Sequence, residues 1–325
     1  MKSLLIYNPA AGRVPLRWFV RRAVRALVRL GWDVDVEATQ SGQHATALAR
    51  QAALAGLDVV FAVGGDGTVG QVAAGLVGAQ TALAILPAGT SNVLSLDLGL
   101  PAFDWNRWWA LEDNVHRLAN GRVAVADVGL CNDRPFLLWA GIGLDAMSIH
   151  KLEPRPRLEK YLSTPVYAAQ TIWNAAVWSG QDMTFTVDGV RRQGHYQLAV
   201  VTNIRTYLGG LAVLSPDACL DDGVMDLWLF EGANLGDAFR HTFNMMAGRH
   251  LSSPDVTRLT FNNLTIESDS PLLLQMDGEP AGSAWQAHVA VLPGALRLLV
   301  PPSALHLFKN ISAGAENLPL RSMAM

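Results

Sequence analysis

The stretch LDVVFAVGGDGTVGQVAAGLVG, residues 57 to 78, joins an apolar, β-branched run to a helix-like segment through a cluster of glycines. A strand that passes through glycines into a helix is typical of phosphate sites, because backbone N–H groups at the start of the helix point at the anion. Asp66 lies in the middle of this cluster, where its carboxylate would repel a bare phosphate. The stretch therefore predicts an α/β fold whose anion site carries an acid of its own.

Three kinds of phosphate chemistry compete for this loop. A Walker-type loop requires a lysine after the glycines, and the chain has no lysine between residues 3 and 150. Gly65, Gly67 and Gly70 satisfy the dinucleotide pattern, but no acidic residue for a ribose follows about 20 positions later. A nucleoside triphosphate with Mg²⁺ would place Asp66 beside the metal or beside an attacking hydroxyl. A plain turn that uses Asp and Gly for their backbone tolerance remains the alternative without chemistry.

Composition and charge limit the class of protein. The 325 residues allow about two domains, and half of them are apolar. The 25 basic and 28 acidic residues give a net charge of −3, so no nucleic-acid partner is expected. The chain has two cysteines, Cys131 and Cys219, which are far apart and lack the spacing of metal ligands. This cysteine usage is typical of proteins in a reducing compartment. We therefore expect a cytoplasmic protein, for which a homodimer is compatible with the sequence.

The order of strand-like and helix-like segments divides the chain. Strands and helices alternate over residues 1–123, which predicts a parallel sheet with helices on both faces. Strand-like runs separated by Asp-Gly, Pro-Gly and Asn-Asn turns predict a mainly β sandwich domain over residues 124–294. Residues 295–310 are expected to return to the first domain, and residues 311–325 to form a flexible tail. In the first domain we expect strands at 3–7, 33–37, 57–63 and 81–87, and helices at 16–30, 43–55 and 69–77.

Five short motifs together resemble the diacylglycerol kinase catalytic-domain family, which includes bacterial lipid kinases, ceramide kinases and sphingosine kinases. They are NPAAG at 8–12, GGDGT at 64–68, PAGTSN at 87–92, DDGVMD at 221–226 and MDGEP at 276–280. NAD kinases share the GGDGT loop but lack this combination. The resemblance implies a three-layer α/β nucleotide-binding domain like that of NAD kinases and diacylglycerol kinases, followed by a β sandwich. It also implies ATP- and Mg²⁺-dependent phosphorylation of the hydroxyl of diacylglycerol or of a sphingoid or ceramide-like lipid.

The resemblance implies a set of nucleotide contacts in the loops that follow the strands. They are Asn8, Pro9, Gly12, Thr39, Gly64, Gly65, Asp66, Gly67, Thr68, Gly70, Thr90 and Asn92. Asn-Pro and Pro-Ala-Gly are also ordinary turn sequences, so these positions have a structural alternative. Thr39 or the nearby Ser41 can equally serve as the N-cap of a helix.

The resemblance also implies catalytic and metal-binding residues. Asp277 and Glu279 are two positions apart, so on an extended strand both carboxylates point to one face. Such a pair suits Mg²⁺ coordination and proton removal from a substrate hydroxyl; Glu279 is the first candidate base, Asp277 the second, and Asp66 completes the catalytic set. The alternative is a hairpin tip, because Asp-Gly is a strong turn signal.

A structural Mg²⁺ site is implied at Asp222, with the backbone carbonyls of Cys219 and Val224 as further oxygen ligands. The Asp-Asp-Gly sequence around Asp222 also makes a good turn, which is the alternative without a metal.

Two positions depart from the family pattern. Gln71 stands where the family often has glutamate, and Val93 where it often has aspartate. The loss of two carboxylates leaves two other functions open. The first is a kinase for a soluble hydroxyl compound, similar to NAD kinase, and the second is a lipid- or nucleotide-binding regulator with impaired catalysis.

Several features suit a lipid substrate and a peripheral, transient membrane contact. Basic residues recur every four positions on one helix face, and two segments are rich in tryptophan. The apolar run within residues 155–178 is the candidate lipid-entry element, since polar residues interrupt it before the about 20 apolar residues that a span requires. A solvated helix face and ordinary core packing are the alternatives. The residues concerned are Arg17, Arg21, Arg25 and Arg29, and Trp105, Trp108, Trp109, Trp173 and Trp178.

Overall fold

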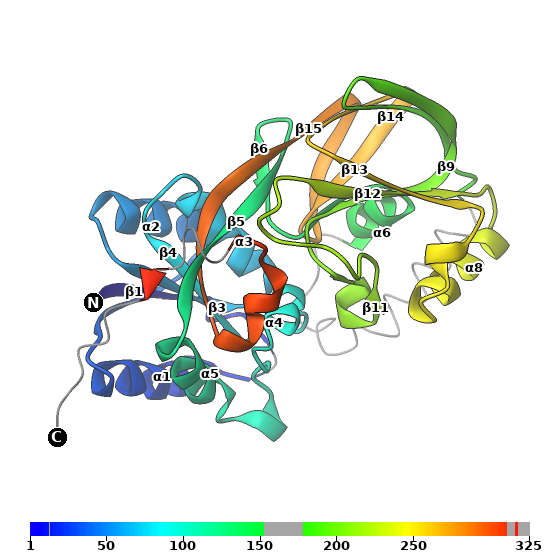
Figure 1. The fold of residues 1–325 in the computed structure, drawn as a ribbon. Helices are drawn as coiled ribbons and strands as arrows, with labels where there is room; N and C mark the ends of the chain where they lie inside the picture. The colour runs from blue at the N-terminus through cyan, green and yellow to red at the C-terminus, as the bar shows by residue number, and fades with distance from the viewer. Residues whose placement is uncertain (13, 153–177, 311–315, 318–325) are drawn as a thin grey trace. The chain divides into compact units, whose positions relative to one another are not determined.

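The computed structural model describes residues 1–12, 14–152, 178–310 and 316–317. The chain divides into two compact units, which are described separately (Figure 1). Unit 1 contains Met1–Val128, Cys219–Asp222 and the described part of Pro293–Met325; unit 2 contains Gly129–Ala218 and Gly223–Leu292. The sequence placed the domain boundaries at 123 and 294, and it did not anticipate that residues 219–222 belong with unit 1.

Unit 1 contains a parallel sheet with the strand order β2-β1-β3-β4-β15, of which β15 contributes its last residues. Helices α1 and α5 cover one face of this sheet, and α2 and α3 cover the other (Figure 1). In chain order the elements are β1 (Lys2–Tyr7), α1 (Arg17–Arg29), β2 (Asp33–Ala38), α2 (Gly42–Leu54), β3 (Val59–Gly64), α3 (Asp66–Leu76), β4 (Ala82–Pro87), α4 (Val93–Asp97), η1 (Trp105–Arg107), α5 (Ala110–Ala119), β5 (Arg122–Cys131), β15 (Glu279–Val300), η4 (Pro302–Leu307) and β16 (Glu316–Asn317).

The central strands are buried along their whole length, because helices cover both faces of the sheet. Every residue of β3 and β4 is buried, which is why both sequences read as continuous apolar runs without alternation. On α1, the buried residues Val20, Ala23 and Leu27 recur at helical spacing and form its inner face. The predicted three-layer α/β domain is confirmed in this unit.

The helix after the glycine loop begins earlier than the sequence pattern suggested. The pattern predicted a start at residue 69, whereas α3 begins at Asp66 with Gly65 as its N-cap in an extended conformation. A carboxylate in the first helical turn interacts favourably with the positive end of the helix dipole, which offsets the low helix propensity of glycine. Asp66, Gly67 and Thr68 therefore lie in the first turn of the helix rather than in a free loop.

Unit 2 is built from antiparallel strands. The order runs β13-β12-β9-β7-β14-β15, and β8 pairs with both β9 and β14, so two routes connect β9 to β14. The long strands β9 and β14 thus change partners half-way along, which produces a sandwich. The elements are β6 (Arg134–Phe136), β7 (Trp139–Gly143), α6 (Leu144–Leu152), β8 (Gln181–Val187), β9 (Val190–Thr202), β10 (Thr206–Tyr207), η2 (Leu208–Gly210), β11 (Ala212–Val213), β12 (Met225–Glu231), α8 (Leu235–Met246), η3 (His250–Ser252), β13 (Val256–Phe261) and β14 (Asn263–Met276).

The core of unit 2 is the apolar interior of this sandwich. Phe136, Phe185, Leu227, Phe261 and Ile266 come from five different strands and are each at most 1% exposed. Side chains of this size account for much of the stability of such a domain, at about 1.5–3 kcal/mol for each fully buried side chain. The predicted mainly β second domain is confirmed.

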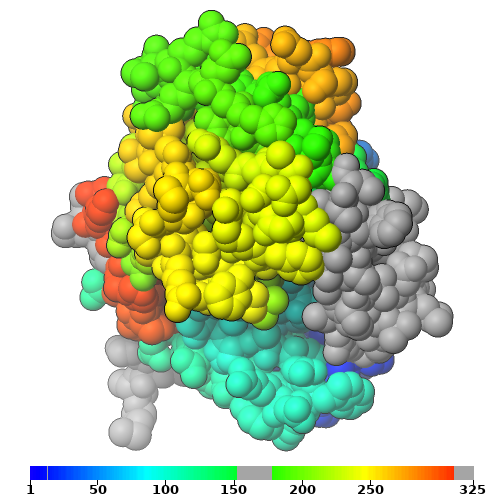
Figure 2. Space-filling view, turned by 90° about the vertical axis from the view of Figure 1, so that its right-hand side faces the viewer, coloured from blue at the N-terminus to red at the C-terminus, as the bar shows by residue number. Residues whose placement is uncertain are grey.

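Helix α8 presents an apolar stripe to the surface of unit 2. Phe239, Phe243 and Met246 are exposed at i, i+4 and i+7 spacing. The part of the chain that includes α8 forms the yellow surface in the space-filling view (Figure 2). Within the described ranges, no helix combines the length and the apolar character that a bilayer crossing requires. The predicted lipid-entry segment, residues 155–178, lies outside the described residues except for Trp178, whose indole N–H donates to the carbonyl of Gln197.

The predicted flexible tail, residues 311–325, lies outside the described residues apart from β16. Glu316 and Asn317 pair with β5 in antiparallel register.

Candidate nucleotide loops and acidic hairpin

The loops that follow β1, β3 and β4 meet at the carboxyl edge of the parallel sheet in unit 1. The amide of Asn8 donates to Val63 O (3.1 Å), and the amide of Ala88 donates to Gly64 O (2.8 Å). The side-chain amide of Asn8 reaches Thr68 Oγ1 at 3.4 Å. Ligands of open α/β sheets bind at this edge. The structure therefore brings the Asn-Pro, Gly-Gly-Asp-Gly-Thr and Pro-Ala-Gly motifs together.

Two glycines allow the loops after β3 and β4 to touch through their backbones. A Cβ atom on Gly65 would lie 3.1 Å from Gly89 Cα, and a Cβ on Gly89 would overlap both the N and the Cα of Gly65. Any side chain at Gly89 would force the two loops apart. Gly12, from the loop after β1, lies against the carbonyl of Ala88.

Asn92 holds the third loop in shape. Its side chain accepts from the amide of Gly89 (3.0 Å) and donates to the carbonyl of the same residue (2.9 Å), and Asn92 is only 5% exposed. The side-chain amide of Asn92, a predicted nucleotide contact, is thus engaged within its own loop. Thr90, by contrast, is exposed at the tip of that loop.

Asp66 is half-buried in the first turn of α3, and its Oδ1 accepts a hydrogen bond from the backbone N–H of Val93 (2.8 Å). The side chain of Val93 is fully buried. The residue that replaces the family's aspartate therefore contributes its backbone to Asp66, and that contribution does not depend on its side chain.

Gln71, the other departure from the family pattern, contacts the neighbouring helix. The hydroxyl of Thr46 on α2 donates to the carbonyl of Gln71 (2.8 Å) and lies 3.1 Å from its side-chain Oε1. A glutamine at this position thus has a packing role between α2 and α3.

Of the remaining predicted nucleotide contacts, Thr39 and Pro9 lie on the same edge. Ser41, and not Thr39, is the N-cap of α2, since its hydroxyl accepts from the amide of His44 (3.1 Å). Thr39 follows β2, is half-buried, and donates its backbone N–H to Tyr7 O (2.9 Å). Pro9 is exposed in the turn after β1. Gly70 lies within α3.

In unit 2, Asp277 and Gly278 form the two-residue turn between β14 and β15. Their φ angles are 52° and 79°, and Met276 pairs with Glu279 across the hairpin. This is the backbone that favours Asp-Gly in tight hairpins. The expectation that Asp277 and Glu279 share one face of an extended strand is wrong, because Asp277 is in the left-handed region and only Glu279 belongs to a strand.

The carboxylate of Asp277 binds the backbone of residues 137–139. It accepts from the amides of Leu137 (2.9 Å), Leu138 (2.8 Å) and Trp139 (3.2 Å). Burial raises the pKa of Asp277 to about 6, against the opposing effects of the three amides and of Arg134. Its contacts make Asp277 an anchor for the segment before β7.

Glu279 is the more accessible of the two acids. Its side chain is 45% exposed, and its Oε2 lies 3.7 Å from Nη2 of Arg134. The other terminal nitrogen of Arg134, Nη1, donates to the carbonyl of Pro280. Arg134 was not identified from the sequence, although it is the only arginine or lysine between Arg122 and Lys151.

A polar chain extends from the hairpin to a carboxylate that the sequence analysis missed. Gln275, which is fully buried, accepts from the amide of Gly278 (3.0 Å) and donates to Asp145 Oδ2 (2.6 Å). The hydroxyl of Tyr207 donates to the same oxygen (2.8 Å). Burial raises the pKa of Asp145, while these two hydrogen bonds act in the opposite direction. Asp145 is a lone acid in the apolar run from Pro135 to Ile149, and that isolation is the signal that could have found it.

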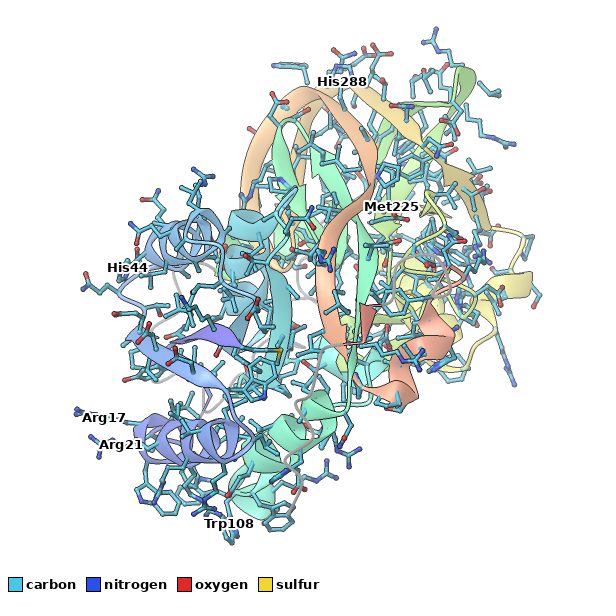
Figure 3. The ribbon with its side chains drawn as sticks, turned by 60° about the vertical axis from the view of Figure 1, so that its left-hand side comes forward. Arg17, Arg21, His44, Trp108, Met225 and His288 are labelled. Carbon is cyan, nitrogen blue, oxygen red and sulfur yellow. The ribbon has the colours of Figure 1, made fainter. Side chains whose placement is uncertain are left out.

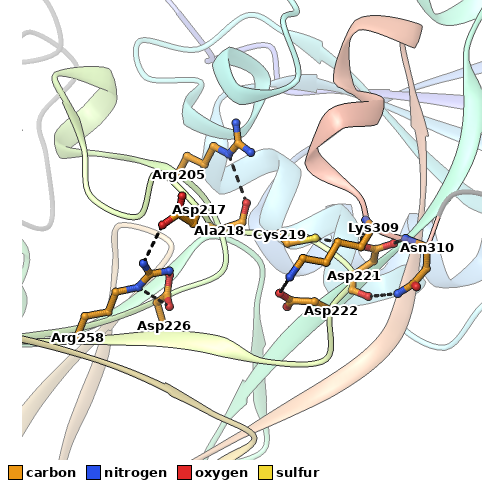
Figure 4. A network of polar contacts seen from close by, with 10 residues as sticks. All are labelled: Arg205, Asp217, Ala218, Cys219, Asp221, Asp222, Asp226, Arg258, Lys309 and Asn310. Atoms are coloured by element: carbon orange, nitrogen blue, oxygen red, sulfur yellow. Dashed lines mark hydrogen bonds and ion pairs between the residues drawn. The ribbon is translucent and has the colours of Figure 1, made fainter. Parts of the chain in front are cut away.

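Asp222, the carboxylate predicted to hold a structural Mg²⁺, is paired with a cation of the chain. Asp222 Oδ2 accepts a hydrogen bond from the ammonium of Lys309 (2.8 Å), and the thiol of Cys219 contacts Asp221 (Figure 4). In the described part of the chain, no group of three or more His, Cys, Asp or Glu side chains could hold a metal ion. A metal site formed by Asp222 and the backbone carbonyls of Cys219 and Val224 remains a prediction.

Comparison with known proteins extends over both units. The model of the diacylglycerol kinase catalytic domain matches residues 2–131, and that of the YegS C-terminal NAD kinase beta sandwich-like domain matches residues 140–300. A protein of Chromohalobacter salexigens named as a YegS-like lipid kinase is 30% identical over 91% of this chain and 92% of its own length. The chain belongs to the diacylglycerol kinase catalytic-domain family.

Other relatives agree with this assignment. The diacylglycerol kinase of Bacillus subtilis is 26% identical, over 86% of this chain and 90% of its own length. A crystal structure from Bacillus anthracis str. Sterne, also described as a diacylglycerol kinase, has a TM-score of 0.74 and 25% identity, over 93% of this chain and 98% of that one. Members of this family are phosphotransferases with an alcohol group as acceptor, and this chain is such an enzyme.

The raised pKa of Asp277 predicts a pH dependence of stability. Between its ordinary value of 3.8 and about 6, the folded state keeps the proton that the unfolded chain releases. The free energy of unfolding should therefore fall as pH rises through this window, by up to about 3 kcal/mol. Asp277→Asn keeps a side-chain oxygen for two of the amides but removes this titration.

Urea unfolding of the wild type and of Asp277→Asn, at intervals from pH 4 to pH 7, measures the effect. The variant should lack the part of the slope between pH 4 and pH 6 that belongs to Asp277. Parallel stability curves for the two proteins would contradict the assigned titration.

Proposed function

We propose that this kinase transfers the γ-phosphoryl group of ATP, in the presence of Mg²⁺, to the hydroxyl of a membrane lipid, with diacylglycerol as the first candidate. The observation that carries the proposal is Asp66, held by the amide of Val93 in the first turn of α3, where backbone N–H groups point outward. A carboxylate among amide donors suits a triphosphate that arrives with its own divalent cation.

The loops at the carboxyl edge of the sheet provide the nucleotide contacts in this proposal. The first turn of α3 and the exposed Thr90 offer donors to the phosphates, and Asp66 offers a ligand to the metal. Asn92 and the Gly65–Gly89 contact fix the loops and so act as positioning residues. Bound Mg²⁺ would neutralise phosphate charge, which is the main requirement for phosphoryl transfer.

Glu279 is the proposed general base. It would accept the proton of the lipid hydroxyl as that oxygen attacks the γ-phosphorus, and its exposed side chain at the start of β15 can reach a substrate. Asp277 positions this hairpin through three backbone amides. Asp145, with Tyr207 and Gln275, supplies a second polar point in the apolar interior of unit 2, suited to a polar lipid headgroup.

The departures at Gln71 and Val93 do not argue for an inactive protein. Gln71 contacts α2, and Val93 contributes the backbone N–H that donates to Asp66, so each residue has a structural role of its own. The choice of diacylglycerol rests on the names of the relatives, which include the Bacillus subtilis diacylglycerol kinase.

A panel assay with labelled ATP tests the proposal. The acceptors are diacylglycerol, ceramide and sphingosine in mixed micelles, with glycerol and NAD as soluble comparisons, each with MgCl₂ or EDTA. Asp66→Asn keeps an oxygen for the amide of Val93 but removes the charge. The variant should fold normally and lose at least about 100-fold in kcat, in line with the loss of a charged group at a reacting centre.

Asp58→Asn is the matched control, since Asp58 stands before β3 and its carboxylate also accepts a backbone N–H, from Lys2. Near-normal turnover by Asp66→Asn would refute the role of Asp66. Transfer to NAD or glycerol, with none to any lipid, would refute the lipid acceptor.

Glu279→Gln tests the base assignment. The substitution keeps the size of the side chain and removes its proton affinity, so kcat for the preferred lipid should fall by about 10²–10⁴-fold while KM for ATP changes little. Initial-rate kinetics over both substrates separate the two effects. The base assignment fails if kcat is unchanged, or if the whole loss lies in KM for ATP.

We further propose that α1 and the neighbouring η1 bring unit 1 to an anionic membrane surface. The helix carries five arginines and no acid, with Arg17 and Arg21 extending into solvent (Figure 3). The guanidinium of Arg22 lies over the rings of Trp18 and Trp108, with its Cζ 5.0 Å and 4.5 Å from the two ring centroids. Both tryptophans are about half exposed. Basic and aromatic side chains in one exposed region suit a lipid headgroup layer.

Vesicle co-sedimentation tests this surface. Each basic residue near an anionic surface contributes about 1 kcal/mol, so Arg17→Gln/Arg21→Gln should weaken binding to vesicles with anionic lipid by at least about tenfold. Arg191→Gln/Arg192→Gln in unit 2 removes the same charge from another exposed site and serves as the control. Equal losses in the two double variants would contradict a specific role for α1.

A further inference from the structure

The segment Cys219–Asp222 is joined to the C-terminal part of unit 1 by a ladder of polar contacts. The amide of Leu220 donates to Leu307 O (2.9 Å), and the carboxylate of Asp221 accepts from the amides of Lys309 (2.6 Å) and Asn310 (2.7 Å). The side-chain amide of Asn310 donates to Asp221 O (2.8 Å). These bonds fix the backbone of Lys309 next to Asp222 (Figure 4).

The ammonium of Lys309 lies 2.8 Å from Oδ2 of Asp222. The side chain of Asp222 is only 17% exposed, whereas the side chain of Lys309 is 64% exposed. The lysine therefore extends from solvent to an acid that is largely buried. We propose that the Lys309 ammonium takes the place of a structural divalent cation at Asp222. The fold of unit 1 then uses a cation supplied by its own chain.

A divalent ion is poorly matched to the groups around Asp222. Mg²⁺ requires a near-octahedral shell of oxygen atoms, whereas an ammonium is satisfied by one to three acceptors. The neighbouring carboxylate of Asp221 is already engaged by two backbone amides and by the thiol of Cys219. A second positive charge beside Lys309 would also be repelled by the ammonium.

The replacement has a consequence for the role of Mg²⁺. The metal needed with the nucleotide and the cation that joins residues 219–222 to the C-terminal segment become independent of each other. Removal of divalent ions should then stop phosphoryl transfer without loosening unit 1.

Thermal unfolding without nucleotide tests the proposal, in 5 mM EDTA and in 5 mM MgCl₂. The wild-type Tm should be the same in both buffers to within about 1 °C. Lys309→Met removes the charge and should lower the Tm in EDTA by about 2–4 °C, a shift expected for a modest loss of stability in a chain of this size. MgCl₂ should restore none of that fall, because the groups around Asp222 are poorly matched to a divalent ion.

Lys2→Met, which removes another exposed lysine of unit 1, controls for net charge, and Lys309→Arg should retain the wild-type Tm. Three results would overturn the proposal. The first is stabilisation of the wild type by Mg²⁺ that Asp222→Asn abolishes. The second is a Tm for Lys309→Met equal to that for Lys2→Met. The third is destabilisation of Lys309→Met that Mg²⁺ reverses, since a divalent ion would then fit the groups around Asp222. The wild-type comparison needs no variant to fold.

Discussion

The contact between the backbones of Gly65 and Gly89 is the constraint on which the candidate nucleotide loops of unit 1 depend. It holds two strand ends at one distance, and it leaves Asp66 in the first turn of α3 and within reach of the amide of Val93. The side chain of Asn92 already bonds the amide and the carbonyl of Gly89, which would lack these partners in a mobile loop. The loops are therefore preorganised and can bind a ligand without rearranging. Order at this edge of the sheet comes from backbone contacts more than from side-chain packing.

Unit 2 uses the same device with a different carboxylate. Asp277 has a left-handed backbone in its hairpin, and it binds three successive amides where the chain enters β7. In both units, an acid that its motif predicts to be catalytic also accepts hydrogen bonds from backbone amides. One side chain can therefore be required for structure and for reaction together, and only substitutions that keep one oxygen, such as aspartate to asparagine, separate the two roles.

The sequence allowed the layers of unit 1 to be predicted because β3 and β4 are unbroken apolar runs, whose burial on both faces leaves no other interpretation. It failed where long-range partners decide the outcome. The start of α3 depends on a cap and a helix dipole, and the conformation of Asp277 depends on amides about 140 residues away. Asp145 and Lys309 were missed for the same reason, since their partners are distant in sequence. The motifs located the loops, but only the structure shows which groups within them are engaged.

Strand β15 has 22 residues, of which the first part belongs to unit 2 and the last part pairs with β4 in unit 1. The ribosome therefore releases the last strand of the parallel sheet of unit 1 only after the residues of the sandwich have been synthesised. At about 5–20 residues per second, the exposed edge of β4 waits many seconds for its neighbour. During that time the apolar edge of β4 must be kept from pairing with another copy of the chain. This requirement follows from the order in which the strands are connected.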